Sequence, residues 1–221
     1  MKIAFPQLPD KALARSAREL TTRLGHGLTI TAIGVLLGVL VSLSAVAVFG
    51  LTDGLLTSWR PDGEVGHVGY TGFYPILFIV PVGAALIVGV LLASLAPDTP
   101  VELADVVAIA HQPDPAVPQV SGYASLVKSL LSVGSGASAG LYGPLLVLGA
   151  SLAGSVRKLL RLSPQHAEMA LGAGVAAAIS GTFSAPLAGI VFAHEVVLRH
   201  YSLRFFAPVT IASATAYVIS G

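Results

Sequence analysis

The sequence predicts an all-α integral membrane protein. Apolar residues make up 54% of the chain and charged residues only 10%, and the mean hydropathy is +0.83, values outside the range of ordinary soluble domains. The chain also has long runs without Asp, Glu, Lys or Arg, and a membrane-spanning helix needs about 20 apolar residues. These uncharged runs are residues 24–52, 65–97, 129–156, 169–194 and 205–221.

The first two runs have the pattern of ordinary membrane spans, with residues 28–51 and 73–96 as their apolar parts. Before them, apolar residues recur at helical spacing among Lys and Arg, which predicts a short amphipathic helix on the membrane surface. The apolar positions are Leu13, Ala17, Leu20 and Leu24. We therefore expect a cytoplasmic amphipathic segment at residues 1–27 and a transmembrane domain at residues 28–221.

The runs 129–156 and 169–194 are interrupted by glycines and a proline, which predicts broken, re-entrant and tilted helices. Irregular backbone at membrane depth is tolerated where it is buried in protein or lines a cavity, so such breaks often mark ligand sites in transporters. Close helix packing is the other explanation for small residues. The interrupting residues are Gly134, Gly136, Gly140, Gly143 and Pro144 in the first run, and Gly172, Gly174, Gly181 and Pro186 in the second.

The positive charges predict one orientation in the membrane. If the N-terminus is cytoplasmic, the chain crosses twice, rises again from Lys128, and turns back at residues 140–144 and later at 180–186. On this path eleven of the 12 Lys and Arg residues are cytoplasmic and only Arg60 is external. We expect a multi-pass protein of a bacterial-type plasma membrane.

Three segments resemble the N-terminal half of CLC-type chloride channels and transporters. Residues 134–160 resemble the stretch built around the family pattern G-[KR]-E-G-P, here Gly-Leu-Tyr-Gly-Pro at 140–144. Residues 174–200 resemble the next stretch, which usually includes A-A-F-N-A-P-[IL]-A-G, here ending in Ser-Ala-Pro-Leu-Ala-Gly at 184–189. Residues 201–220 continue in the same register. The resemblance implies the CLC fold, of which this chain covers the first of two inverted repeats. The second repeat must then come from a longer chain or from a partner polypeptide.

The resemblance also implies an anion site at a helix N-terminus, where unpaired N–H groups and a partial positive charge favour anions. The N–H groups around Leu141, Tyr142 and Gly143, after Gly140, would face chloride or a similar anion, with Pro144 at the first helical position. A homodimer through residues 186–200 and 205–220 is expected, in contact with membrane lipid. We expect no cofactor, no metal and no nucleic-acid partner.

Two departures from the family pattern argue against proton coupling. Tyr142 stands where the family has a gating glutamate, and a phenol stays neutral at physiological pH. Glu195 matches a family glutamate, but the next position, an internal proton site in many exchangers, is Val196. The predicted function is therefore movement of chloride across a membrane without proton coupling. The alternative is a non-conducting, degenerate partner subunit.

A second helix N-terminus is predicted at Thr99 and Pro100, where the family has a G-S-G-x-P turn. Thr99 suits the N-cap, Pro100 the first helical position and Glu102 the third, in a capping box. Pro97 occupies the position of the family serine, and Asp98 would repel an anion. Anion coordination at this second site is therefore not expected to follow the family pattern.

Enzyme functions are less consistent with the sequence. His194 and His200 flank Glu195 as in a zinc protease, but they are six positions apart, whereas H-E-x-x-H requires four. An intramembrane serine protease with Ser138 as nucleophile and His194 as base is a further alternative. We expect His194 to make a polar contact between helices and Glu195 either to act as a polar relay or to pair with His194 or Arg199.

The charge asymmetry makes a direct prediction about topology. The chain contains no cysteine, so single cysteines can be introduced at Arg60 and at Lys158 without background. A membrane-impermeant thiol reagent should label position 60 only from outside and position 158 only from inside, because the positive residues favour the cytoplasm. Labelling of both positions from both sides would show that the chain inserts in two orientations.

Overall fold

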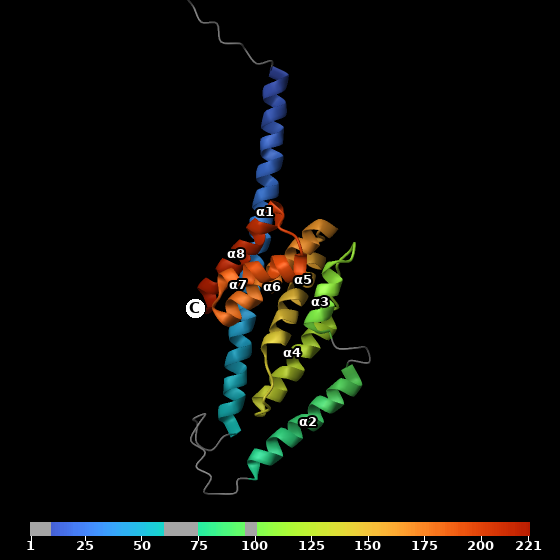
Figure 1. Ribbon diagram of the computed structural model, residues 1–221, viewed down its shortest axis with the longest axis vertical. Helices are drawn as coiled ribbons and strands as arrows, with labels where there is room; N and C mark the ends of the chain where they lie inside the picture. Colours follow the sequence, from blue (N-terminus) through green and yellow to red (C-terminus); the bar gives the residue numbers. More distant parts are fainter. Residues whose placement is uncertain (1–9, 60–74, 96–100) are drawn as a thin grey trace, which may run out of the picture.

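The computed structural model describes residues 10–59, 75–95 and 101–221, and within these ranges it contains helices and no strand (Figure 1). The all-α prediction is therefore confirmed for the described part of the chain. The helices are α1 (Asp10–Trp59), α2 (Ile76–Leu95), α3 (Leu103–Ala110), α4 (Gln119–Gly134), α5 (Tyr142–Leu160), α6 (Pro164–Phe183), α7 (Pro186–Phe192), the π-helical η1 (Ala193–Leu198) and α8 (Leu203–Ser220).

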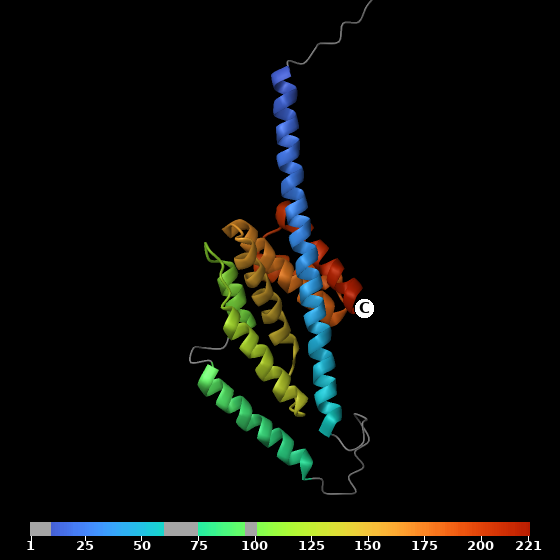
Figure 2. The ribbon, with the colours of Figure 1, turned by 180° about the vertical axis from the view of Figure 1, so that it is seen from behind.

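Three of the described helices are long and apolar enough to cross a membrane: Gly27–Trp59 within α1, Tyr142–Leu160 and Leu203–Ser220. The separate short helix that we predicted before residue 28 is instead the first part of α1, which runs without interruption from Asp10. Both ribbon views show this part extending beyond the other helices (Figures 1 and 2). A position of residues 1–27 at the membrane surface remains a prediction.

The helices α5 and α6 cross with their backbones in contact. A Cβ atom added to Gly149 would lie 2.4 Å from the carbonyl oxygen of Gly174, and one added to Gly174 would lie 2.4 Å from that of Gly149. Only glycine at both positions allows this approach. Gly174 lies inside the unbroken α6, so it serves packing and does not interrupt the helix.

The helix α8 packs against α1 and α6 through small residues and hydroxyl groups. A Cβ at Gly38 would lie 2.7 Å from the carbonyl oxygen of Ala212. The Ser180 hydroxyl donates a hydrogen bond of 2.6 Å to the carbonyl oxygen of Ser213, and the Ser213 hydroxyl donates one of 2.8 Å to that of Pro186. These bonds satisfy buried polar groups and fix α8 beside the start of α7.

The first predicted break is confirmed. It separates α4 from α5 at residues 135–141. Gly136 in this break has a φ of 97°, a backbone conformation that residues other than glycine rarely adopt. The indole Nε1–H of Trp59 donates a hydrogen bond of 2.9 Å to the carbonyl oxygen of Gly134 at the end of α4. The end of α1 therefore covers one side of the irregular backbone.

The second break is narrower than the predicted span of residues 180–186. The helix α6 continues through Ser180 and Gly181 to Phe183, and only Ser184, with a φ of 51°, and Ala185 separate it from α7. Pro186 begins α7, where its missing N–H costs no helical hydrogen bond. Gly181 has room for a methyl group, so the structure does not explain it by packing.

We had predicted that an element rising through the membrane begins at Lys128, and this prediction was wrong. Lys128 is in the middle of α4, which starts at Gln119, and α4 runs antiparallel to α5: Lys158 at the end of α5 donates a hydrogen bond of 2.9 Å to the Gln119 amide oxygen. In the sequence, Lys128 is the last charged residue before an uncharged run, but helix packing places it within the bundle. Its Nζ atom is buried and has no hydrogen-bond partner in the described part of the chain.

The contact between Gly149 and Gly174 predicts a large cost for a single methyl group. Gly174→Ala should lower the free energy of unfolding of the full-length protein by about 1–3 kcal/mol, since the added Cβ must push the two helices apart. Gly83→Ala in α2 is the matched control, because no atom lies within 4 Å of its added Cβ. Equal unfolding curves for the two variants in a detergent titration would contradict the packing described above.

Candidate functional site

The candidate site is the N-terminus of α5. The helix begins at Tyr142 after the buried N-cap residue Leu141, whose carbonyl oxygen accepts a hydrogen bond of 3.0 Å from the Leu145 N–H. We had predicted Pro144 at the first helical position, but it is the third residue of α5. It still lies in the first turn, where N–H groups have no helical partner. In the described part of the chain, the N–H groups of Tyr142 and Gly143 donate no hydrogen bond.

The electrostatics of α5 favour an anion at this end. No acidic or basic residue lies between positions 129 and 156, so no carboxylate of this segment neutralises the partial positive charge of the helix N-terminus. Arg157 and Lys158 lie in the last turn, where basic side chains complement the negative end of the helix. The charges of α5 are thus arranged to leave its first turn positive.

Gly140 and Gly143, beside the start of α5, are not explained by packing against the described residues. A Cβ added to Gly143 would meet no atom within 4 Å, and one added to Gly140 would meet only the Tyr142 ring at 4.0 Å. By contrast, Gly134 at the end of α4 packs against Leu55. The absence of side chains at Gly140 and Gly143 leaves the backbone open to a small ligand.

Tyr142 joins the two breaks of the chain. Its ring stacks on that of Phe183, the last residue of α6, with ring centroids 4.5 Å apart and an interplanar angle of 24°. The side chain of Tyr142 is 49% exposed. The structure therefore brings the segments 140–144 and 184–189 together, although about 40 residues separate them in the sequence.

The predicted second helix N-terminus is only partly within the described residues. Thr99 and Pro100 lie outside them. Glu102, predicted at the third helical position, is instead the N-cap of α3, and its backbone N–H donates a hydrogen bond of 2.8 Å to the Asp105 carboxylate. The carboxyl groups of Glu102 and Asp105 at this helix end disfavour a bound anion.

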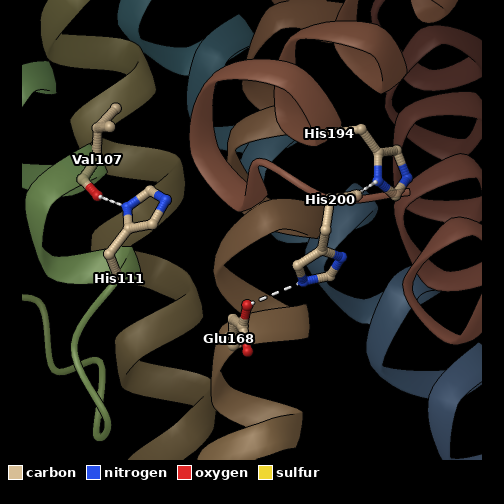
Figure 3. A network of polar contacts seen from close by, with 5 residues as sticks. All are labelled: Val107, His111, Glu168, His194 and His200. Carbon is tan, nitrogen blue, oxygen red and sulfur yellow. Dashed lines mark hydrogen bonds and ion pairs between the residues drawn. The ribbon is translucent and has the colours of Figure 1, made fainter. Parts of the chain in front are cut away.

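His194 is fully buried in η1, and its Nδ1–H donates a hydrogen bond of 3.0 Å to the carbonyl oxygen of His200 (Figure 3). Glu195 is exposed, and the predicted alternative that pairs it with His194 or Arg199 is not found among the described residues. It accepts a hydrogen bond of 2.8 Å from the Tyr201 hydroxyl, and this bond raises the pKa of the Tyr201 phenol. Both side chains thus hold the segment between η1 and α8.

The catalytic alternatives find no geometric support. In the part of the chain that the structure describes, no group of three His, Asp or Glu side chains could hold a metal ion. His194 contacts His200, Tyr201 and Phe206, and no hydrogen bond joins it to Ser138. The serine protease arrangement is therefore not formed by these two residues.

Sequence reasoning missed two polar features of the structure. Lys128 is one, and the helical pattern of residues 119–134 around it was the available signal. The other is the hydrogen bond of 3.1 Å between the His200 Nε2 atom and the Glu168 carboxylate of α6 (Figure 3). These two residues are 32 positions apart, so no local spacing predicts their contact.

Residues 84–221 match the family model described as "Voltage gated chloride channel". This match covers more than half of the chain and includes the α5 N-terminus and both breaks. The chain belongs to the voltage-gated chloride channel family. The resemblance to CLC proteins noted in the sequence is thereby confirmed.

Curated relatives bear names of the same family. The chain is 37% identical over 107 residues to a putative chloride channel protein ClcB-like from Ralstonia nicotianae, covering 45% of this chain and 25% of that protein. It is 44% identical over 72 residues to the chloride channel protein CLC-e of Arabidopsis thaliana, covering 33% and 10% of the two chains. The aligned regions thus make up a quarter or less of these relatives.

Two solved structures share the fold. A slow cyanobacterial Cl⁻/H⁺ antiporter aligns with a TM-score of 0.69 at 19% identity, over 86% of this chain and 45% of that one. A CLC-type fluoride/proton antiporter aligns with a TM-score of 0.65 at 23% identity, over 89% and 46%. The all-α CLC membrane fold is therefore confirmed, and the chain spans less than half of each solved protein.

Proposed function

We propose that this chain forms part of a chloride channel or transporter and that the N-terminus of α5 binds the anion. The observation that carries the proposal is the pair of unpartnered N–H groups of Tyr142 and Gly143, at an uncharged helix end whose glycines leave the backbone open. Family membership supports chloride as the ligand. The names of the relatives, which are chloride channels, agree with it.

Such a helix end suits an ion that must both bind and leave. A chloride ion in the membrane has to replace its water shell, and N–H groups with partial charges do this. Partial charges also bind the anion less tightly than a directly contacting ammonium group would, which permits conduction.

Tyr142 gives the proposed site its distinctive chemistry. Its hydroxyl can donate one hydrogen bond to an anion, but the side chain has no carboxylate at the position where the family has a gating glutamate. Val196, in the position of a family proton site, has no titratable group. We therefore propose anion movement without proton coupling, although the two solved relatives are proton antiporters.

The proposed pathway needs more protein than this chain. Since the chain spans under half of each solved relative, the second repeat would be supplied by a longer polypeptide or by a partner. We also propose a homodimer through α7 and α8, which expose large apolar side chains. These are Leu187, Val191, Leu203, Phe206 and Val218.

Substitutions at Tyr142 test this function in vesicles that contain the full-length protein. Tyr142→Ala should raise chloride flux several-fold, because it removes a ring that stands at the α5 N-terminus and is held there by Phe183. Tyr142→Phe is the matched control, since it keeps the stacked ring and removes only the hydroxyl.

Wild-type flux should move no protons, whereas stoichiometric proton antiport in the wild type would refute the uncoupled mechanism.

A further inference from the structure

The segment that joins η1 to α8 is held by two histidines. Arg199 ends η1 with a left-handed φ of 54°, and the chain then turns through His200 into α8. The buried His194 donates its Nδ1–H to the His200 carbonyl oxygen, which fixes the backbone of this turn (Figure 3). The turn is therefore anchored from the side of η1.

The His200 ring anchors the same turn to α6. Its Nε2 atom lies 3.1 Å from the Glu168 carboxylate, and its edge meets the Phe205 ring of α8 at a centroid distance of 4.6 Å. The side chains of His200 and Glu168 are 38% and 29% exposed, and both line a cavity of about 430 Å³. The contact between His200 Nε2 and Glu168 therefore borders water, whereas the His200 Nδ1 atom is buried and has no hydrogen-bond partner among the described residues.

We propose that Glu168 and His200 form a pH-sensitive latch that holds the start of α8 on α6. A histidine side chain changes its charge between about pH 5 and pH 8, and a charged donor binds a carboxylate more strongly than a neutral one does. The contact is strongest when the imidazole carries a proton and the carboxylate does not, which for histidine and glutamate side chains is the case in mild acid. A neutral imidazole binds the carboxylate less strongly, so the contact weakens as the pH rises.

The other charged and titratable groups near His200 do not replace Glu168 as its partner. On α6, His166 is bonded through Nδ1 to the Ser163 hydroxyl at 2.7 Å, and on α8 the exposed Arg204 lines the same cavity. From the described side chains of α1, which begin at Gly27, only the apolar Ile30 lines it. Arg204 opposes a charge on His200, but Glu168 is the group in direct contact.

The charged side chains of η1 and of the turn after it, Glu195 and Arg199, lie in surroundings other than the Glu168–His200 contact. Glu195 is bonded to Tyr201, and Arg199 lines a separate cavity together with His111 of α3. His194 has no exposure to water, and a charge placed there would be buried at a high cost. The pH response therefore belongs to His200 and Glu168, while His194 supplies a fixed anchor.

Through α8, the latch connects the turn at His200 to the two breaks of the chain. Ser213 lies ten residues after Leu203, which is about 15 Å along α8, and bonds to Pro186 at the start of α7. Phe183, three residues before Pro186, stacks on Tyr142. The latch goes beyond the proposed anion function, because it acts on the packing of α8 whether or not the protein conducts.

Spin labels can test the latch in the full-length protein in lipid nanodiscs. Cysteines replacing Leu159 of α5 and Ala207 of α8 carry the labels, since both positions are exposed and neither is among the residues of the proposed dimer interface. Double electron–electron resonance should give a narrow distance distribution at about pH 5.5 and a broader one at about pH 8, where His200 is neutral. His200→Gln and Glu168→Gln should each abolish this difference and keep the broad distribution at both pH values.

The variant His111→Gln is the matched control. His111 is exposed and bonded through Nδ1 to the Val107 carbonyl oxygen at 2.7 Å, without a carboxylate partner, so this variant should keep the full pH response (Figure 3). Two latch variants are used because either one alone could misfold. Identical distributions for the wild type at both pH values, or a pH response that survives in either latch variant, would overturn the proposal.

Discussion

The backbone contact between Gly149 and Gly174 is the constraint on which the candidate site depends. The two helices are antiparallel, with a turn of three residues between them, and this crossing fixes their relative position along the axis. Tyr142 lies seven residues, about 10 Å, from Gly149, and Phe183 lies nine residues, about 13 Å, from Gly174, both toward the same end. The stacked pair at the α5 N-terminus is a consequence of this crossing.

The membrane environment is the reason why we propose a ligand at this arrangement. Unpaired backbone groups are costly in lipid, so the two breaks must be covered by protein or by a ligand. Trp59 covers the end of α4, and the hydroxyl of Ser213 covers the start of α7. The first turn of α5 has no such protein partner among the described residues, and it is the place where a chloride ion would complete the structure.

The sequence predicted the helices and the break before α5 because local chemistry determines both. Uncharged runs predict spans, and Gly140, Gly143 and Pro144 predict an interruption. It did not predict that Lys128 lies inside α4 or that Glu195 binds Tyr201, because these placements depend on which helix faces pack. The position of Pro144 in α5 was wrong by two residues, since the helix starts at Tyr142 and not at the proline.

The central claim is that the N-terminus of α5 binds the permeating anion, and a crystal structure of the full-length protein in bromide would test it most directly. Bromide replaces chloride and is located by its anomalous scattering. The account predicts a bromide peak in contact with the backbone nitrogens of Tyr142 and Gly143. Bromide peaks elsewhere in the pathway, with none at this helix end, would contradict it.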